Sequence, residues 1–387
     1  MGRSLLNFRD NTSPRGPVTV DRQLACSSCR YDRQMAVRDL IIVGAGPSGL
    51  SAAIEAKRQG LDYQVIEQGV LVNSIFNFPP QMIFFTTPEL LEIGGLPFVT
   101  PYDKPTRAEA LKYYRRVVDT YDLQIAFEET VLSVAREEAA LDVTAESTPS
   151  AGTGGNEDER IFEVETRSSR GVRRVRLARN VIFAIGYYDR PNYLGVPGED
   201  LPHVHHYYRE PHPFYRQRIV IVGGGNSAAE WALELFRSDA HVTRVHRHSE
   251  LKKTIKYWVK PDIENRIKEG SIAARFNALL TEIRPTSVIV KPVETGGAGG
   301  AGGEEELPAD AVFLLIGYHT DWGLMERAGV ILRDRQVPTY DPETFETNVP
   351  GLFLAGGAIC GRDTSNIFIE NGRFHGERII ATIAARR

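Results

Sequence analysis

Asp39-Leu-Ile-Ile-Val-Gly44-Ala-Gly46-Pro-Ser48-Gly49-Leu-Ser-Ala-Ala-Ile54 is the stretch that decides the fold of this chain. A short apolar run ends there in three glycines with the spacing G-x-G-x-x-G, and a helical pattern follows directly. In such a turn the first glycine permits the tight strand-to-helix connection, the second lets the backbone approach a pyrophosphate, and the third lets helix and strand pack closely. The start of the helix also offers unpaired N–H groups to phosphate. The stretch therefore predicts a strand over about 38–43, a helix over about 48–59 and a dinucleotide site between them.

A carboxylate follows at the distance that this motif requires. The next strand, Tyr63-Gln-Val-Ile-Glu67, ends about 20 residues beyond the glycines, where an acid hydrogen-bonds the hydroxyls of a ribose. Because glycines, helix and strand are in register, we interpret Glu67, followed by Gln68, as part of a site for a nucleotide with free ribose hydroxyls, as in FAD.

The composition limits the function. In 387 residues, 46 basic and 50 acidic side chains give a net charge of -4, and the length allows two domains with separate cores. No apolar stretch reaches the roughly 18 residues that cross a bilayer, and the N-terminus lacks the apolar core of a signal peptide. We therefore expect a cytoplasmic protein that binds neither nucleic acid nor membrane.

The first 34 residues are polar, rich in arginine and without period, so we expect a disordered extension. They contain Cys26-Ser-Ser-Cys29. Three interpretations of this pair are open: a redox dithiol, half of a zinc site, or two cysteines without a function. A redox C-x-x-C opens a helix of a folded domain and a zinc site needs two more ligands, so we predict no metal site.

The rest of the first half alternates irregular and regular segments. Residues 70–105 are rich in aromatics and prolines, and such a long irregular stretch is usually functional. Thr106 and Glu109 form a capping box that predicts a helix through about residue 120. A Gly/Ser/Thr/acid run at 147–159 predicts a flexible hairpin tip. The predicted strands are 131–135, 140–145, 161–166, 172–177 and a buried one over 180–186, which closes on Gly186.

A second copy of the glycine device begins at Arg218-Ile-Val-Ile-Val-Gly223-Gly-Gly225-Asn226-Ser227-Ala228. It has the pattern strand, G-x-G-x-x-A, helix. Its second strand, 241–245, leads into His246-Arg247-His248, and no carboxylate stands where Glu67 stands in the first copy. A basic cluster there suits a ribose 2'-phosphate, which a guanidinium can grip. This copy therefore predicts a preference for NADPH.

The C-terminal part returns to strands that close on glycine. Residues 311–317 repeat the form of 180–186 and end on Gly317, and 347–357 end on Gly356 and Gly357. A last helical stretch starts at about Glu370. We place an FAD-binding domain at 35–190 and 318–387 and an NADPH-binding domain at 191–317, both α/β and Rossmann-like.

These motifs together resemble the two-domain pyridine nucleotide–disulfide oxidoreductases related to thioredoxin reductase, in which the FAD domain is split by the NADPH domain. Two longer stretches, 196–211 and Phe368-Ile-Glu370-Asn371-Gly-Arg-Phe-His-Gly376, are similar to the bacillithiol-disulfide reductase family. The resemblance covers about residues 36–385. It implies a three-layer fold, FAD and NADPH as cofactors, and Glu370 and Asn371 near the flavin.

The chain departs from these relatives at three places. Thioredoxin reductases carry a redox Cys-x-x-Cys just before the second glycine motif, whereas 203–217 contain no cysteine here. Ser48 stands where the bacillithiol family has a cysteine, and Gly357 stands where the wider class has an acid. Cys360, four residues past Gly356, is the remaining cysteine: it is a thiol that meets a mixed disulfide, or a small buried side chain.

The sequence thus predicts an FAD-dependent NADPH oxidoreductase that reduces a low-molecular-weight thiol disulfide, bacillithiol disulfide by resemblance. Alternatives are a ferredoxin- or flavodoxin-type NADP reductase, a flavin monooxygenase, and a nucleotide-binding redox sensor. The acceptor would be a small-molecule disulfide or a small redox protein, and we expect a homo-oligomer. The expected catalytic residue is Cys360. The expected cofactor-binding residues are Gly44, Gly46, Pro47, Ser48, Gly49, Glu67, Gln68, Gly186, Gly223, Gly225, Asn226, Ser227, Ala228, His246, Arg247, His248, Gly317, Gly356, Gly357, Glu370 and Asn371.

Overall fold

The structure, a computed structural model, describes residues 36–137, 161–293, 303–364 and 366–387. The chain divides into Met1–Met35 and a second compact unit, Ala36–Arg387, which contains every element described below. Three sequence expectations lie outside the described residues: the N-terminal extension with Cys26 and Cys29, the strand at 140–145 and the hairpin tip at 147–159.

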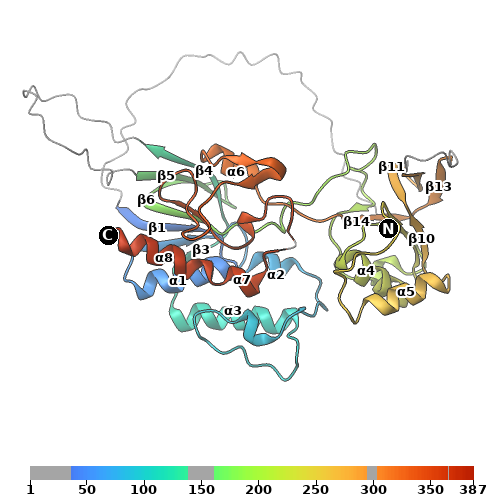
Figure 1. Ribbon diagram of the computed structural model, residues 1–387, viewed down its shortest axis with the longest axis horizontal. Coiled ribbons are helices and arrows are strands. Elements are labelled where there is room, and N and C mark those ends of the chain that lie inside the picture. Colours follow the sequence, from blue (N-terminus) through green and yellow to red (C-terminus); the bar gives the residue numbers. More distant parts are fainter. Residues whose placement is uncertain (1–35, 138–160, 294–302, 365) are drawn as a thin grey trace, which may run out of the picture. The chain divides into compact units, whose positions relative to one another are not determined.

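The first and largest sheet has seven strands and contains the first glycine motif (Figure 1). Its path is β3-β2-β1-β6-β5-β4, and β17 pairs with the other edge of β6. The strands β3, β2, β1, β6 and β17 are parallel, and β4, β5 and β6 form an antiparallel meander. The bounds are β1 (Val37–Val43), β2 (Tyr63–Ile66), β3 (Ile125–Ala126), β4 (Glu129–Glu137), β5 (Ile161–Ser168), β6 (Arg173–Phe183) and β17 (Leu352–Leu354). Because β17 comes from the C-terminal part, this sheet is discontinuous in sequence.

One long strand, β6, replaces two predicted ones. The sequence indicated separate strands at 172–177 and 180–186, with a gap at 178–179. In the structure β6 continues through them, since its first half pairs antiparallel with β5 and its second half pairs parallel with β1. The amide of Asn180 also donates to the carbonyl of Asp39 on β1, at 3.1 Å. The polar side chain of Asn180 is thus accommodated inside the sheet by a cross-strand hydrogen bond.

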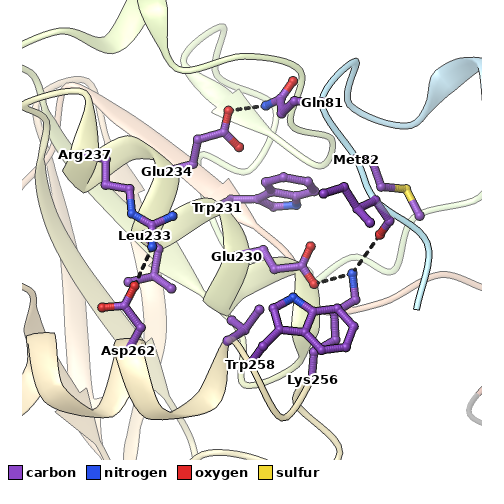
Figure 2. Close-up of a pocket in the computed structure, with 12 residues that line it drawn as sticks. Gln81, Met82, Glu230, Trp231, Leu233, Glu234, Arg237, Lys256, Trp258 and Asp262 are labelled. Atoms are coloured by element: carbon purple, nitrogen blue, oxygen red, sulfur yellow. Dashed lines mark hydrogen bonds and ion pairs between the residues drawn. The ribbon is translucent and has the colours of Figure 1, made fainter. Parts of the chain in front are cut away.

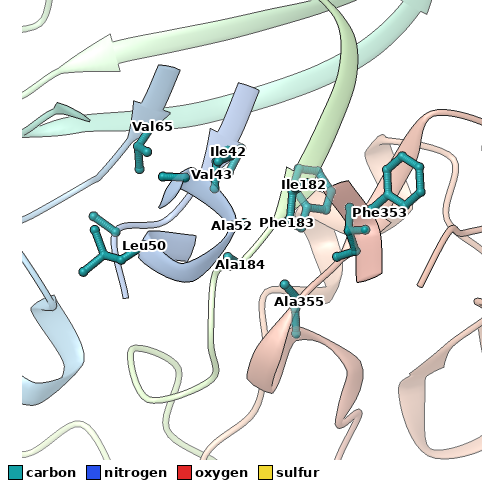
Figure 3. Close-up of a cluster of buried hydrophobic side chains, with 14 of the residues drawn as sticks. Ile42, Val43, Leu50, Ala52, Val65, Ile182, Phe183, Ala184, Phe353 and Ala355 are labelled. Carbon is teal, nitrogen blue, oxygen red and sulfur yellow. The ribbon is translucent and has the colours of Figure 1, made fainter. Parts of the chain in front are cut away.

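The core beneath the first glycine motif is formed by apolar side chains of the parallel strands and of α1 (Figure 3). Ile42, Val65 and Ile182 are fully buried, as is Leu50 on α1. α1 and α8 lie side by side and cover the same part of this sheet (Figure 1). The helices of this part of the chain are α1 (Pro47–Arg58), α2 (Asn73–Asn77), α3 (Arg107–Tyr121), α6 (Trp322–Arg327), α7 (Ile369–Gly372) and α8 (His375–Ala385), with 3-10 turns η1 (Pro88–Leu91), η4 (Asp334–Gln336) and η5 (Gly356–Ile359). A small sheet pairs β15 (Leu332–Arg333) with β16 (Val337–Pro338).

Two helix predictions have different outcomes. The capping box is confirmed: the Thr106 hydroxyl accepts from the Glu109 N–H at 3.3 Å, the Glu109 carboxylate accepts from the Thr106 N–H at 2.8 Å, and α3 follows. The single helix from about Glu370 is wrong in its extent, because α7 ends at Gly372 before α8 begins. A Cβ at Gly372 would lie 3.1 Å from the Ser48 Oγ and 3.1 Å from the Gly356 Cα, so α7 ends where the chain passes close to the first glycine motif.

The second glycine motif lies in a parallel five-stranded sheet with the order β10-β9-β8-β14-β7. One face packs on α4 and α5, and the other on an antiparallel sheet, β11-β12-β13, which gives three layers. The bounds are β7 (Val204–His205), β8 (Arg218–Val222), β9 (His241–His246), β10 (Ala273–Phe276), β11 (Ala278–Arg284), β12 (Ser287–Pro292), β13 (Glu305–Pro308), β14 (Ala311–Leu314), α4 (Asn226–Arg237), α5 (Lys260–Lys268) and η3 (His212–Phe214). The predicted α/β, Rossmann-like fold class is confirmed in both sheets.

Candidate nucleotide sites

The first glycine turn (residues 44–49) connects β1 to α1 and depends on glycine at two of its three positions for packing. Gly44 has φ +109°, and a Cβ there would lie 2.5 Å from the carbonyl oxygen of Ala184, just past β6. A Cβ on Gly49 would collide with the carbonyl oxygen of Gly44. The first and third glycines therefore hold strand, helix and β6 together, as the motif predicts.

For the middle glycine, the described part of the chain gives no such packing reason. Gly46 has φ -76°, which any residue adopts, and a Cβ there would meet no heavy atom within 4 Å. The backbone in front of it is open, next to the start of α1, where Pro47 is the first helical residue. The second copy repeats this feature, since Gly225 has φ -94° and open space at its Cβ. A phosphate group that approaches the backbone accounts for glycine at both positions, so the two turns fit dinucleotides.

Glu67 closes the first site. Its Oε2 accepts from the Ala45 N–H at 2.8 Å, and its Oε1 accepts from the Gly69 N–H at 2.9 Å. Burial raises the pKa of the Glu67 carboxyl, these N–H groups lower it, and the nearby charge of Asp189 raises it. A carboxylate fixed in this way at the end of β2 can accept hydroxyl groups of a ribose.

Asp189 lies next to Gln68, at the end of β2 where Glu67 also lies. The sequence did not predict Asp189 as a site residue. The Gln68 amide donates to Asp189 Oδ2 at 2.7 Å. The Asn73 amide lies 3.4 Å from the other carboxylate oxygen. Burial raises the pKa of Asp189. The sequence signal was its position three residues after Gly186, beyond the buried strand.

The C-terminal segment brings two predicted glycines to this turn. Gly356 has φ +60°, and a Cβ there would collide with the Ser48 Oγ on α1. A Cβ on Gly357 would lie 2.6 Å from the ring of Tyr187 and 3.5 Å from the Gly186 Cα. Gly356, Gly357, Ser48 and Gly186 therefore meet at the carboxyl ends of β1, β6 and β17. In open α/β sheets this edge is where ligands bind.

His375, also not predicted, fixes the Gly356 backbone. Its Nδ1 accepts from the Gly356 N–H at 3.1 Å, and its ring stacks on Phe345 with centroids 4.1 Å apart. Burial, with a contribution from the Arg378 charge, lowers the pKa of His375 to about 4. The imidazole is therefore neutral at pH 7, as an acceptor at Nδ1 must be.

The residues predicted on α7 lie near this edge because α7 packs on α1. Glu370 is in the first turn of α7. The Asn371 Oδ1 accepts from the Phe368 N–H at 2.9 Å, and its amide donates to the Asn366 carbonyl at 2.8 Å. Asn371 therefore shapes the segment that precedes α7.

The second glycine turn (residues 223–228) repeats the geometry of the first. Gly223 has φ +144°, and a Cβ there would collide with the Leu315 carbonyl oxygen and approach the Ala228 Cβ at 3.2 Å. Asn226 holds the neighbouring loop: its Oδ1 accepts from the Lys256 N–H at 2.7 Å and its amide donates to the Thr254 carbonyl at 3.1 Å. Ser227 follows in the first turn of α4. Gly317, with φ +95°, lies past the neighbouring strand β14 and accepts at its carbonyl from the Asn192 N–H at 3.0 Å.

The basic cluster at the end of β9 divides into a buried and an exposed part. His246 is buried, and its ring lies against Gly224, so that a Cβ there would collide with it. Burial and the charges of neighbouring basic groups lower the pKa of His246 to about 4. Arg247 and His248 are exposed, and the Arg247 Nε lies 3.2 Å from the His248 Nε2. The exposed pair is free to meet a ligand.

Cys360 lies at the end of η5, three residues after Gly357. Its side chain is 8% exposed. Burial, together with the nearby charge of Asp363, raises the pKa of its thiol to about 12. In this arrangement the thiol keeps its proton at pH 7, whereas a nucleophilic cysteine needs a lowered pKa and access.

A cavity of about 390 Å³ lies beside α4 (Figure 2). It is lined by charged groups that are paired among themselves. Lys256 Nζ lies 2.7 Å from Glu230 Oε1 and donates to the Ile83 carbonyl at 3.3 Å, and Arg237 pairs with Asp262. Both basic groups of the lining are thus paired with acids, and Glu234, hydrogen-bonded to the Gln81 amide, adds a negative charge, so the cavity does not suit a phosphate. Among the described residues no helix is long and apolar enough to span a membrane.

This chain resembles known proteins of one family of oxidoreductases. The family model for pyridine nucleotide-disulphide oxidoreductases matches residues 41–151 and 156–356, which is most of the chain. The chain belongs to this family. It is therefore an oxidoreductase, and the predicted resemblance to the thioredoxin reductase-like members is confirmed.

Individual members of the family show the same relationship. Bacilliredoxin reductase Bdr of Bacillus subtilis (strain 168) is 40% identical over 350 residues, which are 89% of this chain and 97% of that protein. The structure of bacillithiol disulfide reductase Bdr from Bacillus cereus matches with a TM-score of 0.81 at 36% identity and covers 91% of this chain and 100% of its own. Lactococcus lactis thioredoxin reductase, at 20% identity and a TM-score of 0.67 over 90% of this chain and 100% of its own, shares the fold.

Proposed function

We propose that the chain is an FAD-dependent NADPH oxidoreductase that reduces a low-molecular-weight thiol disulfide, with bacillithiol disulfide as its substrate. The observation that carries the nucleotide part is the pair of open glycines, Gly46 and Gly225, each beside a helix start. The names of the Bacillus relatives supply the acceptor. The balanced reaction is NADPH + H⁺ + RS–SR → NADP⁺ + 2 RSH.

The contrast at the two strand ends supports the assignment of the nucleotides. Glu67, an acid held by two N–H groups, suits the free hydroxyls of the FAD ribose. His246, Arg247 and His248 occupy the corresponding end of β9, where a carboxylate would repel a 2'-phosphate and a guanidinium can grip it. We therefore assign residues 35–190 and 318–387 to FAD and residues 191–317 to NADPH.

Bound flavin would supply the two-electron chemistry between nicotinamide and disulfide. The chain's own residues bind and orient it: the first glycine turn receives the pyrophosphate, Glu67 the ribose, and the Gly356–Gly357 backbone, held by His375, lies at the same edge. Ser48 carries a hydroxyl and not a thiol, so it cannot form a disulfide. Cys360 keeps its proton at pH 7 in this arrangement. We propose that Cys360 takes part only if the bound substrate changes its surroundings, which a substitution can test.

The test is an anaerobic titration of the purified, FAD-loaded protein. Adding NADPH should bleach the flavin absorbance near 450 nm, and adding bacillithiol disulfide should restore it with release of two thiols per NADPH. Failure to bleach would contradict the proposal as a whole. Bleaching followed by reoxidation with ferredoxin or flavodoxin but not with the disulfide would favour the NADP reductase alternative. Cys360→Ala with undiminished disulfide turnover would remove that thiol from the reaction.

A further inference from the structure

Arg244, which the sequence did not single out, is a buried guanidinium behind the second glycine turn. It lies in the middle of β9, paired with Ile221 on β8 and Ala274 on β10, and is 2% exposed. Its Nη2 donates to the Gly223 carbonyl at 2.9 Å. Its Nε and Nη1 are also buried and have no hydrogen-bond partner in the described part of the chain.

No carboxylate in the described residues forms an ion pair with this guanidinium. Burial lowers the pKa of Arg244 to about 10, so the group is still charged at pH 7. Buried charges in proteins are normally paired, because an uncompensated one is costly. Either the fold tolerates Arg244 for the one hydrogen bond to Gly223, or its charge acts without direct contact on an anion that binds at the neighbouring turn.

The first copy of the glycine motif has an apolar residue at the position that corresponds to Arg244. Val222 pairs with Val245 as Val43 pairs with Ile66, and the first glycine of each turn donates its N–H to that partner's carbonyl. Counting from these pairs, His246 corresponds to Glu67 and Arg244 corresponds to Val65. A fully buried valine serves the same place in the first copy, so strand packing does not require an arginine there.

The guanidinium acts on the turn through one peptide group. Arg244 donates to the carbonyl of Gly223, and the N–H of that same peptide belongs to Gly224. A hydrogen bond to the carbonyl polarises the peptide and makes its N–H a stronger donor. In the first copy the equivalent N–H, of Ala45, is used by the Glu67 carboxylate, whereas His246 stands at that place in the second copy. The second turn thus has a peptide group polarised by Arg244, and a neutral imidazole stands where the first turn has a carboxylate.

The neighbouring groups have the same sign. Arg244, Arg247 and Lys252 act electrostatically on His246, and the His248 ring lies against it with centroids 5.2 Å apart, which places four basic side chains around one imidazole. The backbone N–H of Lys252 also donates to the Gly224 carbonyl at 3.3 Å. Basic groups in the described part of the chain therefore gather at this end of β9, which suits an anionic ligand.

We infer that Arg244 is a positioning residue that selects a 2'-phosphorylated adenine nucleotide, by placing a buried positive charge behind the turn through Gly223 and beside His246. This inference rests on the proposed use of NADPH and adds to it a residue that does not touch the ligand. It predicts that the effect of Arg244 depends on the 2'-phosphate and not on the nucleotide as a whole.

The test compares two probes that differ in that group alone, adenosine 2',5'-bisphosphate and adenosine 5'-monophosphate. Their binding to the FAD-loaded full chain is measured by isothermal titration calorimetry. Arg244→Met should weaken the bisphosphate by about tenfold, the size of one charge acting at short range in a partly screened site. The monophosphate should change by less than about twofold. Arg244→Lys, which keeps the charge, should retain most of the preference.

The outcomes separate this inference from the proposed function. If the unsubstituted protein binds both probes equally, the assignment of NADPH fails. The inference is overturned if the unsubstituted protein and Arg244→Met prefer the bisphosphate to the same extent. It is also overturned if Arg244→Met loses affinity for both probes equally, because Arg244 then only stabilises the glycine turn. Should Arg244→Met fail to fold, Arg244→Lys decides: a folded lysine variant without the preference contradicts the role of the charge.

Discussion

The hydroxyl oxygen of Ser48 lies against Gly356, in the space that a Cβ at residue 356 would need. Ser48 is in the first turn of α1, and Gly356 follows β17, more than 300 residues later in the chain. Their contact closes the carboxyl-end edge of the first sheet around the glycine turn. Two features hold the Gly356 backbone in this contact: its positive φ, and the hydrogen bond from its N–H to the His375 Nδ1.

Gly356→Ala should therefore damage the FAD site more than an ordinary alanine substitution. The methyl group would collide with Ser48, and φ +60° is unfavourable for alanine, so we expect a loss of about 2–4 kcal/mol in stability. The FAD content, from the ratio of absorbance at 450 and 280 nm, should fall by more than half. The double variant with Ser48→Gly should recover part of both losses because only the backbone strain remains. A double variant no better than Gly356→Ala would show that the contact is not the cause.

A second prediction concerns the carboxylate that receives two backbone N–H groups. In Glu67→Gln the amide NH₂ must face one of these donors, so one hydrogen bond to a charged group is lost. Such bonds contribute about 1.5–3 kcal/mol, and FAD should bind roughly 10- to 100-fold more weakly. The measurement is the dissociation constant of FAD from the flavin fluorescence of the reconstituted protein. The control is Glu282→Gln, whose carboxylate pairs with Arg284 on an exposed part of β11. Equal FAD affinity in both variants would contradict the role of Glu67.

The two glycine turns show which parts of the site are predictable from sequence. The spacing of Gly44 and Gly49, or of Gly223 and Ala228, reflects contacts within one strand–turn–helix unit, which are local in sequence. The position of Glu67 follows for the same reason, because β2 is the next strand along the chain. Local units of this kind carry their geometry in a short motif.

The residues that were missed depend on contacts between distant segments. His375 reaches Gly356 because α8 packs on α1, and Asp189 reaches Gln68 because β6 and β2 both pair with β1 in the sheet. Arg244 was missed for another reason: an arginine inside a strand suggests an exposed position, and only the structure shows that it is buried. The merging of two predicted strands into β6 likewise needed the partner strands, because the gap predicted at 178–179 is bridged by pairing with β1 and β5.

A third prediction uses the lowered pKa of His375. Its pKa is about 4 in the folded chain and 6.5 is its ordinary value, so below pH 6.5 the unfolded state binds a proton that the folded state does not. Stability should therefore fall as the pH is lowered from 6.5 to 4, by up to about 3 kcal/mol from this group. In His375→Gln, whose amide oxygen can still accept from Gly356, the fall should be shallower by that amount. Urea unfolding at pH 7 and pH 5, an interval that contains about 2 kcal/mol of this effect, measures it, with His212→Gln, at an exposed position, as the control. Parallel pH profiles for all three proteins would contradict the assignment.

The last prediction concerns the reactivity of Cys360. A thiol with a pKa of about 12 carries almost no thiolate at pH 8, and its side chain is 8% exposed. In a variant with Cys26 and Cys29 replaced by serine, iodoacetamide should therefore modify Cys360 at least about 100-fold more slowly than a free cysteine with a pKa near 8.5. Mass spectrometry of timed samples gives the rate, and the same protein in urea, where the thiol is exposed, gives the reference. Rapid alkylation of the native protein would mean that the thiol is accessible as thiolate, and would return Cys360 to the reaction as a nucleophile. Slow alkylation that becomes fast when bacillithiol disulfide is added would show instead that the substrate exposes it.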